Sequence, residues 1–147
     1  MATRNFREML EAKWAEGKFV CVGLDSDFVK IPQTVIHPEW VDKHPNSWDF
    51  RRTIKAFNEK IVEATKDIVC AFKPNLAFYL KKGIEGFEAL FDTMEYIESS
   101  EVDVSVILDC KDADIGNTND GYAECFFEWL CVDAITTNPY LGGEALH

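Results

Sequence analysis

Short apolar runs alternate with stretches of helical periodicity along this chain. Runs of five or six residues, rich in β-branched and aromatic side chains, indicate buried strands. The predicted strands cover residues 19–24, 68–72, 104–108 and 132–136. Helical spacing separates these runs, so we expect an α/β fold of parallel strands joined by helical crossovers.

Five helices are expected between these strands and ahead of the first one. Apolar residues recur three or four positions apart in each of them. The predicted helices cover residues 5–14, 47–65, 76–82, 87–97 and 117–130. We expect Ser47 and Asp49 to cap the second helix, and Gly83 and Gly86 to precede the fourth.

The second helix has the clearest apolar face, and a long loop precedes it. The face is formed by Ile54, Phe57, Ile61 and Val62. Residues 26–46 contain three of the five prolines and little periodicity, which predicts an irregular connection.

Length and charge narrow the class of protein. The 147 residues correspond to one domain and can bury a sizeable core. A net charge of −11 argues against non-specific binding to nucleic acid or to an anionic membrane, because both repel an acidic surface. No charged-then-apolar leader opens the sequence, and no apolar run approaches membrane-spanning length. We therefore expect a cytoplasmic protein that binds neither nucleic acid nor membrane.

The five cysteines and three histidines are the residues most suited to disulfides or metal binding. No two cysteines form a C-x-x-C pair and their number is odd, which favours buried free thiols in a reducing compartment. Neither His37, His44 nor His147 lies at ligand spacing from a cysteine cluster. The sequence therefore predicts no metal site.

Charged residues gather directly after the third predicted strand. Asp109, Lys111 and Asp114 follow the apolar run that ends at residue 108. Two carboxylates and an ammonium this close in sequence shift one another's pKa, which suits acid-base chemistry. In α/β barrels the chemistry lies at this end of the strands.

The first two predicted strands end on polar residues of the same kind. Asp25 follows the first strand, and Lys73 and Asn75 follow the second. Because the carboxyl ends of parallel strands converge on one face of a barrel, we expect these side chains to meet those after the third strand. The sequence thus predicts one acid-base pocket built from three separated segments.

Four motifs at these strand ends resemble the orotidine 5'-phosphate decarboxylase family. The motifs are Gly23–Asp25, Phe72–Tyr79, Leu108–Thr118 and Thr136–Tyr140. The long loop after the first strand and the Phe-Lys-Pro-Asn block are most similar to the branch that includes long bacterial and apicomplexan forms. The resemblance covers essentially the whole chain.

This resemblance implies half of a TIM barrel. The family has a (β/α)₈ barrel of about 250 residues, and residues 1–147 resemble its N-terminal half. In the family, the phosphate-gripping arginine, the closing loop and the pyrimidine-reading residues come from later strands. The resemblance therefore implies little activity for the chain alone. Its exposed strand edges imply a homodimer or pairing with a C-terminal half.

Family roles can be carried over to the charged cluster. The resemblance implies that Lys111 donates a proton to the C6 carbanion left when carbon dioxide departs, which yields UMP. It places Asp109 beside the substrate carboxylate, and Lys73 between Asp109 and the ribose. It implies no metal and no other cofactor.

The remaining implied roles concern substrate binding and a subunit interface. Asp25 and Asn75 would hold ribose hydroxyls or the charged network. Asp114 would reach into the site of a dimer partner, with Ile115 and Thr118 lining the shared edge. Asp114 could instead cap the helix that follows Ile115.

Two other functions stay open on the sequence. A 3-keto-gulonate-phosphate decarboxylase shares the Asp-x-Lys-x-x-Asp element but needs a metal, and the Phe-Lys-Pro-Asn block fits it poorly. A half barrel could also act only as a non-catalytic binding or assembly module. Turnover of orotidine 5'-phosphate separates these from the leading interpretation.

Overall fold

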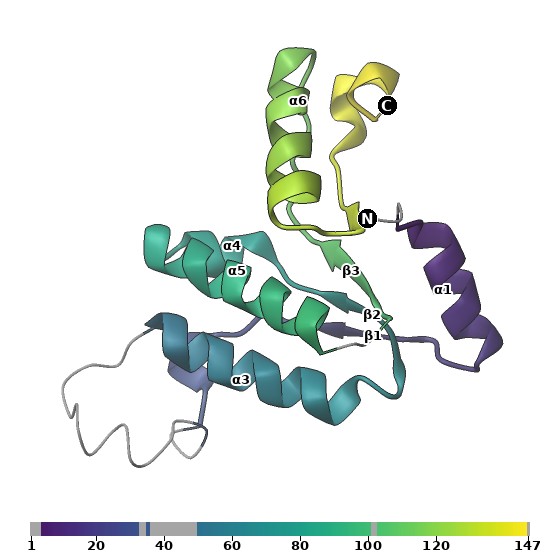
Figure 1. Cartoon of the computed structure of the whole chain (residues 1–147). Coiled ribbons are helices and arrows are strands. Elements are labelled where there is room, and N and C mark those ends of the chain that lie inside the picture. The colour runs from purple at the N-terminus through teal and green to yellow at the C-terminus, as the bar shows by residue number, and fades with distance from the viewer. Residues whose placement is uncertain (1–3, 33–34, 36–49, 101–102, 147) are drawn as a thin grey trace.

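Four parallel strands form a single sheet in the order β1-β2-β3-β4 (Figure 1). The computed structural model describes residues 4–32, 35, 50–100 and 103–146. The strands are β1 (Val20–Gly23), β2 (Val69–Lys73), β3 (Ser105–Leu108) and β4 (Ala134–Ile135). Each strand lies next to the one that follows it in sequence, with helices in between, so the predicted α/β fold of parallel strands is confirmed.

A helix is present in each of the five segments where the sequence predicts one. The α-helices are α1 (Phe6–Ala15), α3 (Phe50–Thr65), α4 (Leu76–Leu80), α5 (Ile84–Ser99) and α6 (Asn117–Ala123). Short 3₁₀ segments are η1 (Phe28–Lys30), η4 (Pro139–Leu141) and η5 (Gly143–Leu146), and the π-helical η3 (Glu124–Trp129) continues α6. The expected caps Ser47 and Asp49 lie outside the described residues. No helix in the described part of the chain is long and apolar enough to cross a membrane.

The core lies between the sheet and the helices α3 and α5, which run side by side (Figure 1). Ile54 and Val62 of α3 are fully buried, while the other two residues of the predicted apolar face are partly buried. They share one cluster with Leu90 of α5 and with Phe72 and Leu108 of the strands. Burial of these side chains stabilises the fold by about 1.5–3 kcal/mol each.

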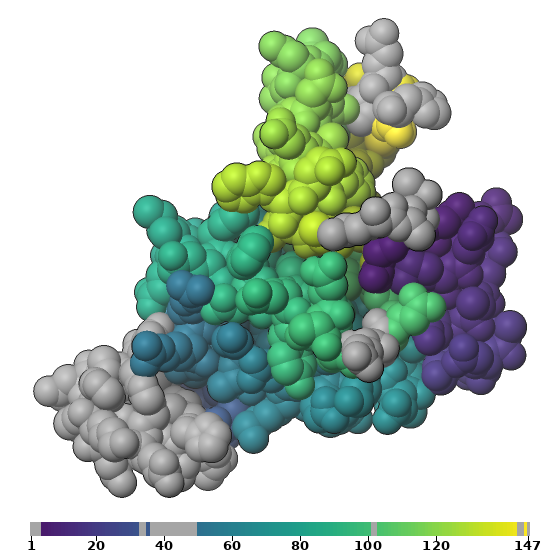
Figure 2. Space-filling view, in the orientation of Figure 1, coloured from purple at the N-terminus to yellow at the C-terminus, as the bar shows by residue number. Residues whose placement is uncertain are grey.

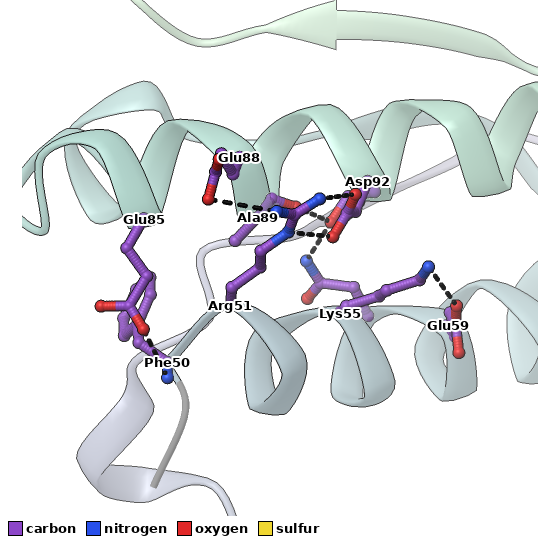
Figure 3. Close-up of polar contacts among 10 residues, drawn as sticks. Phe50, Arg51, Lys55, Glu59, Glu85, Glu88, Ala89 and Asp92 are labelled. Atoms are coloured by element: carbon purple, nitrogen blue, oxygen red, sulfur yellow. Dashed lines mark hydrogen bonds and ion pairs between the residues drawn. The ribbon is translucent and has the colours of Figure 1, made fainter. Parts of the chain in front are cut away.

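An ion-pair cluster joins α3 to α5 on the outside of this core (Figure 3). The guanidinium of Arg51 binds both carboxylate oxygens of Asp92, at 2.7 and 2.8 Å, and Glu88 at 3.1 Å. The Phe50 backbone N–H at the start of α3 donates to the Glu85 carboxylate at 3.0 Å. These contacts set the position of the first turn of α3 along α5.

Two strand predictions need correction. The segment 19–24 was expected to be buried, but Phe19 is 69% and Val20 51% exposed. Among the described residues β1 has a partner strand only on the β2 side, so its edge is open to solvent. The fourth strand is shorter than expected, since only Ala134 and Ile135 pair with β3.

All five cysteines are free, as predicted, but only Cys70 is buried. Cys21 lies on the open strand β1, and Cys131 follows the π-helical turn; both are exposed. The sequence predicts buried free thiols, and the predicted burial is wrong at these two positions because burial depends on which elements pack alongside.

The structure also places Gly86 inside α5, whereas the sequence suggested that it precedes the helix. A methyl group at Gly86 would lie 1.9 Å from the backbone oxygen of Tyr79 in α4. The glycine therefore permits α4 and α5 to touch backbone to backbone.

Substituting two helical glycines tests this contact. Gly86→Ala is expected to lower the free energy of unfolding by about 1–3 kcal/mol, because the added methyl group meets the α4 backbone. Gly121→Ala in α6 is the matched control, since nothing lies within 4 Å of its added methyl group. It should raise stability by about 0.5–1 kcal/mol through helix propensity. Urea unfolding of both variants measures the difference, and equal effects would contradict the close contact.

The Asp92 carboxylate should make stability depend on pH. Its hydrogen bonds to Arg51 lower the pKa of Asp92 below its usual value, so its contribution is complete above the unfolded pKa of about 3.9 and is lost as pH falls through the folded value. Asp92→Asn should cost about 1.5 kcal/mol at pH 7, and the difference from wild type should shrink below about pH 4. Urea unfolding across this pH range measures it, with Glu95→Gln on the exposed side of α5 as control. A difference that stays constant down to pH 2 would contradict this role.

Candidate active site

The carboxyl ends of β2, β3 and β4 lie level with one another. The strand β2 ends at Lys73, and the next bridge in the sheet joins Asn75 to Asp109 directly after β3. Leu108 pairs with Ile135 across β3 and β4. This register brings the residues that follow each strand to one edge of the sheet.

Alternation along the strands turns the charged side chains away from the helices. Phe72 and Leu108 are fully buried in the core on the helix side. Because successive residues of a strand point to opposite faces, Lys73 and Asp109 project from the other face. That is the face on which a barrel keeps its interior.

Asp109 binds two lysines at once. Its Oδ2 accepts a hydrogen bond from the Lys73 ammonium at 2.9 Å, and its Oδ1 is in direct contact with the Lys111 ammonium. The Thr136 hydroxyl donates to the same Oδ1 at 2.8 Å. The side chain of Asp109 is 13% exposed and that of Lys111 65%, so the carboxylate is held at the base of the site while one amine faces solvent.

These contacts fix the charge state of the cluster. Hydrogen bonds from Lys111, then Lys73 and Thr136, hold the pKa of Asp109 well below its usual range, although partial burial opposes the shift. The pKa of Lys73 is raised, chiefly by its bond to Asp109 and further by the charge of Asp25. At neutral pH the site therefore presents one carboxylate between two ammonium groups.

The backbone at Lys111 has an uncommon conformation. Its φ of 59° lies in the left-handed region, where a residue with a side chain costs about 1–2 kcal/mol. The Lys111 N–H donates to the Thr136 hydroxyl at 3.2 Å, and the Cys110 thiol donates to the Thr136 carbonyl at 3.3 Å. These bonds to the end of β4 hold the turn that carries the amine back toward Asp109.

Thr136 is a site residue that the sequence pattern did not predict. The Thr136 hydroxyl accepts a hydrogen bond from the Lys111 backbone N–H and donates one to the Asp109 carboxylate, so it contacts both residues. A signal was present, because Thr136 is a polar residue at the end of the fourth predicted strand, and in the structure it directly follows β4 as Lys73 and Asp109 follow the ends of their predicted strands. Thr136 also opens the fourth motif of the family resemblance, Thr136–Tyr140, but no site role is predicted for it there.

The other predicted site residues from the first two strands lie beside this cluster. Asp25 is exposed after β1, close enough for its charge to act on Lys73. Asn75 is half-buried, and its side-chain oxygen accepts the Ala77 N–H at 3.2 Å, which caps α4. Asn75 thus has a structural role as well as a place at the strand end.

The residues predicted for a subunit interface lie apart from this cluster, with Asp114 half-buried. The Asp114 carboxylate accepts the Ile115 N–H at 2.8 Å, and Ile115 and Thr118 are both exposed. The residue that caps α6 is Gly116, so the alternative in which Asp114 caps that helix is wrong. In the part of the chain that the structure describes, no hydrogen bond or ion pair joins these residues to Lys111 or Asp109.

Known proteins share both this sequence and this fold. The chain is 43% identical over 143 residues to the orotidine 5'-phosphate decarboxylase of Thermomicrobium roseum, and 39% identical over 140 residues to that of Porphyromonas gingivalis. These alignments cover 97% and 95% of the chain but 46% of each relative. The chain thus spans about half the length of the curated relatives it matches.

A solved structure gives the same proportion. The OMP decarboxylase of Leishmania donovani superposes with a TM-score of 0.76 at 28% identity, over 97% of this chain and 48% of that one. The predicted half of a (β/α)₈ barrel is therefore confirmed, with β1 to β4 as its parallel strands. Residues 18–147 match the Orotidine 5'-phosphate decarboxylase / HUMPS family, and the chain belongs to that family.

Proposed function

We propose that residues 1–147 form the N-terminal catalytic half of an enzyme that converts orotidine 5'-phosphate to UMP in pyrimidine synthesis. The observation that carries this proposal is the Asp109 carboxylate held between Lys73 and Lys111 at the strand ends. Relatives of 39–43% identity are named orotidine 5'-phosphate decarboxylase, which favours this substrate over a sugar-acid phosphate.

The proposed step needs one mobile proton and one fixed negative charge. The bond between C6 and the carboxyl carbon breaks, carbon dioxide leaves, and the electron pair stays on C6. The Lys111 ammonium stabilises this charge and transfers a proton to C6. Asp109, ionised at neutral pH, would lie beside the departing carboxylate and hold the ammonium in place.

Substrate binding is assigned to the neighbouring strand ends. Lys73 would bridge Asp109 and the ribose, and Asp25 and Asn75 would hold ribose hydroxyls. The proximity of Asp25 to Lys73 supports this assignment, since a carboxylate and an ammonium can together bind neighbouring hydroxyl groups. We also expect this enzyme to act in the cytoplasm, in keeping with its five free cysteines.

We propose that the open edge of β1 pairs with a C-terminal half barrel. A cleft of about 470 Å³ lies beside β1 and α3, lined largely by apolar side chains that include Val22, Leu24 and Phe57. The relatives are about twice as long as this chain, and a C-terminal half like theirs could fill the cleft. An unpaired parallel strand edge next to an apolar cleft favours such a partner.

A second assembly is proposed through the segment ahead of α6. α6 stands out from the rest of the molecule (Figure 2). Ile115 is 58% exposed there, next to Asp114 and Thr118. We propose that this surface joins two copies and brings Asp114 to the partner's site.

Sedimentation velocity tests the assembly. The chain is expected to sediment as a dimer or larger species, and Ile115→Asp should shift it toward monomer because the aspartate places a charge in an apolar contact. Ile84→Asp is the matched control, since Ile84 is more exposed, at 82%, but lies at the start of α5. A clean monomer for the wild-type chain would contradict the proposal.

Turnover tests the catalytic role of Lys111. The chain alone should show little loss of orotidine 5'-phosphate absorbance, and mixing with the C-terminal half of the Thermomicrobium roseum decarboxylase should restore turnover. Lys111→Ala should then reduce the rate by about 10²–10⁴-fold, the usual contribution of a proton donor. Lys60→Ala on the exposed side of α3 is the control and should leave the rate unchanged.

Three outcomes would contradict this function. A fully active Lys111→Ala complex would exclude Lys111 as the proton donor. A well-formed wild-type complex without turnover would favour the non-catalytic assembly module. Activity only with magnesium and a sugar-acid phosphate would favour the 3-keto-gulonate-phosphate type of enzyme.

A further inference from the structure

The position of Asp25 is not explained by the sheet alone. The ladder between β1 and β2 ends at the pair Gly23 and Lys73, and the Leu24 N–H makes one further bond to the Lys73 carbonyl at 3.0 Å. Asp25 comes after this last contact, beyond the end of the edge strand β1, and it is exposed. Its carboxylate turns back toward the pair of Gly23 and Lys73, since a methyl group at Gly23 would lie 3.6 Å from the Asp25 Oδ1. Another set of contacts must therefore hold its backbone.

Both neighbours of Asp25 are bound to one buried polar cluster. The Tyr79 hydroxyl of α4 donates to the Leu24 carbonyl at 2.9 Å, and the Ser26 hydroxyl donates to the Asn58 side-chain oxygen. The Asn58 amide nitrogen of α3 donates to the Tyr79 hydroxyl at 3.0 Å. The residues before and after Asp25 are thus tied to the same pair of side chains.

The cluster is fully satisfied and closed to solvent. Asn58 uses its second amide hydrogen on the Thr93 hydroxyl at 3.0 Å, and Thr93 donates to the Ala89 carbonyl at 2.8 Å. Asn58, Tyr79 and Thr93 are each at most 1% exposed. Burial raises the pKa of Tyr79, so its hydroxyl stays protonated and remains a donor at all physiological pH values.

A polar cluster of this kind adds direction rather than packing. Apolar side chains of similar volume in place of the whole cluster would fill the same space, and such joint replacements are often nearly neutral for stability. Hydrogen bonds also fix orientation, because each donor must point at its acceptor. Here the acceptors and donors at the sheet end belong to Leu24 and Ser26, on either side of Asp25.

We propose that Asn58 and Tyr79 are positioning residues that hold the Asp25 carboxylate beside the Lys73 ammonium. Both side chains are buried, and they act through their hydrogen bonds to Leu24 and Ser26. The importance of this for catalysis rests on the proposed function, in which Asp25 and Lys73 bind the substrate ribose.

The interaction between Asp25 and Lys73 provides a direct measurement. The titratable groups acting on Lys73 are the carboxylates of Asp109, which binds it, and Asp25, together with the Cys21 thiol, and Lys111 lies across Asp109. Asp25→Asn removes one of these and should lower the pKa of Lys73 in the wild-type background. The size of that decrease reports how close the Asp25 carboxylate is held.

A double-mutant cycle then tests the positioning role. The pKa of Lys73 is measured by NMR from the side-chain ¹³Cε shift, in the chain without substrate. Tyr79→Phe removes only the hydroxyl, and the decrease caused by Asp25→Asn should fall to less than half its wild-type size. Ser26→Ala should have the same effect, and it replaces Tyr79→Phe if that variant does not fold.

Thr93→Val is the matched control. It also removes a buried hydrogen bond to Asn58, but it touches neither Leu24 nor Ser26. If the cluster only stabilises the fold, Tyr79→Phe, Ser26→Ala and Thr93→Val should change the effect of Asp25→Asn on the pKa of Lys73 alike. If the cluster positions Asp25, that effect should keep its full size in Thr93→Val.

The proposal is overturned if Asp25→Asn lowers the pKa of Lys73 as much in the folded Tyr79→Phe and Ser26→Ala variants as it does in the wild-type chain. Because this measurement involves no substrate, such a result would leave the Lys111 turnover experiment untouched. Failure of the turnover experiment, in turn, would leave the measured interaction between Asp25 and Lys73 intact.

Discussion

The Asp109 carboxylate connects three strands at the edge on which the site is built. It follows β3, binds Lys73 from the end of β2, and accepts the Thr136 hydroxyl from the end of β4. A buried carboxylate without partners would take up a proton, but two ammonium groups and a hydroxyl keep this one charged. The same contacts that stabilise the ion also fix the distance between the two amines. The contacts of Asp109 therefore hold the ends of β2, β3 and β4 together and also position the two lysine amines.

Much of this arrangement can be predicted from the sequence because the fold obeys local rules. Apolar runs identified all four strands, and polar residues directly after them identified Lys73, Asp109 and Lys111. Parallel topology then required those residues to meet. The features that failed depend on more distant neighbours. Val20 is exposed because no strand of the described residues pairs with the free side of β1. Gly86 is required because α4 packs against α5 at this point. Sequence periodicity predicts neither kind of neighbour.

The polar cluster behind the site shows a second limit. Asn58 lies between Phe57 and Ile61 on the helix whose apolar pattern is the clearest in the chain, and a single polar residue there does not alter that pattern. Only the fold shows that it faces Tyr79, Thr93 and the end of β1. Sequence patterns predict which face of a helix is buried, but not which buried polar groups find one another.

The turn at Lys111 has a consequence for redesign. Only glycine, asparagine and aspartate adopt its backbone conformation at low cost, and none of them carries an amine. The position therefore combines the side chain to which we assign the proton transfer with a conformation that this side chain disfavours, and Thr136 supplies the compensating bond. Grafting the lysine alone onto another scaffold would lose this geometry. A successful transplant would have to carry the whole turn together with the threonine of the adjoining strand.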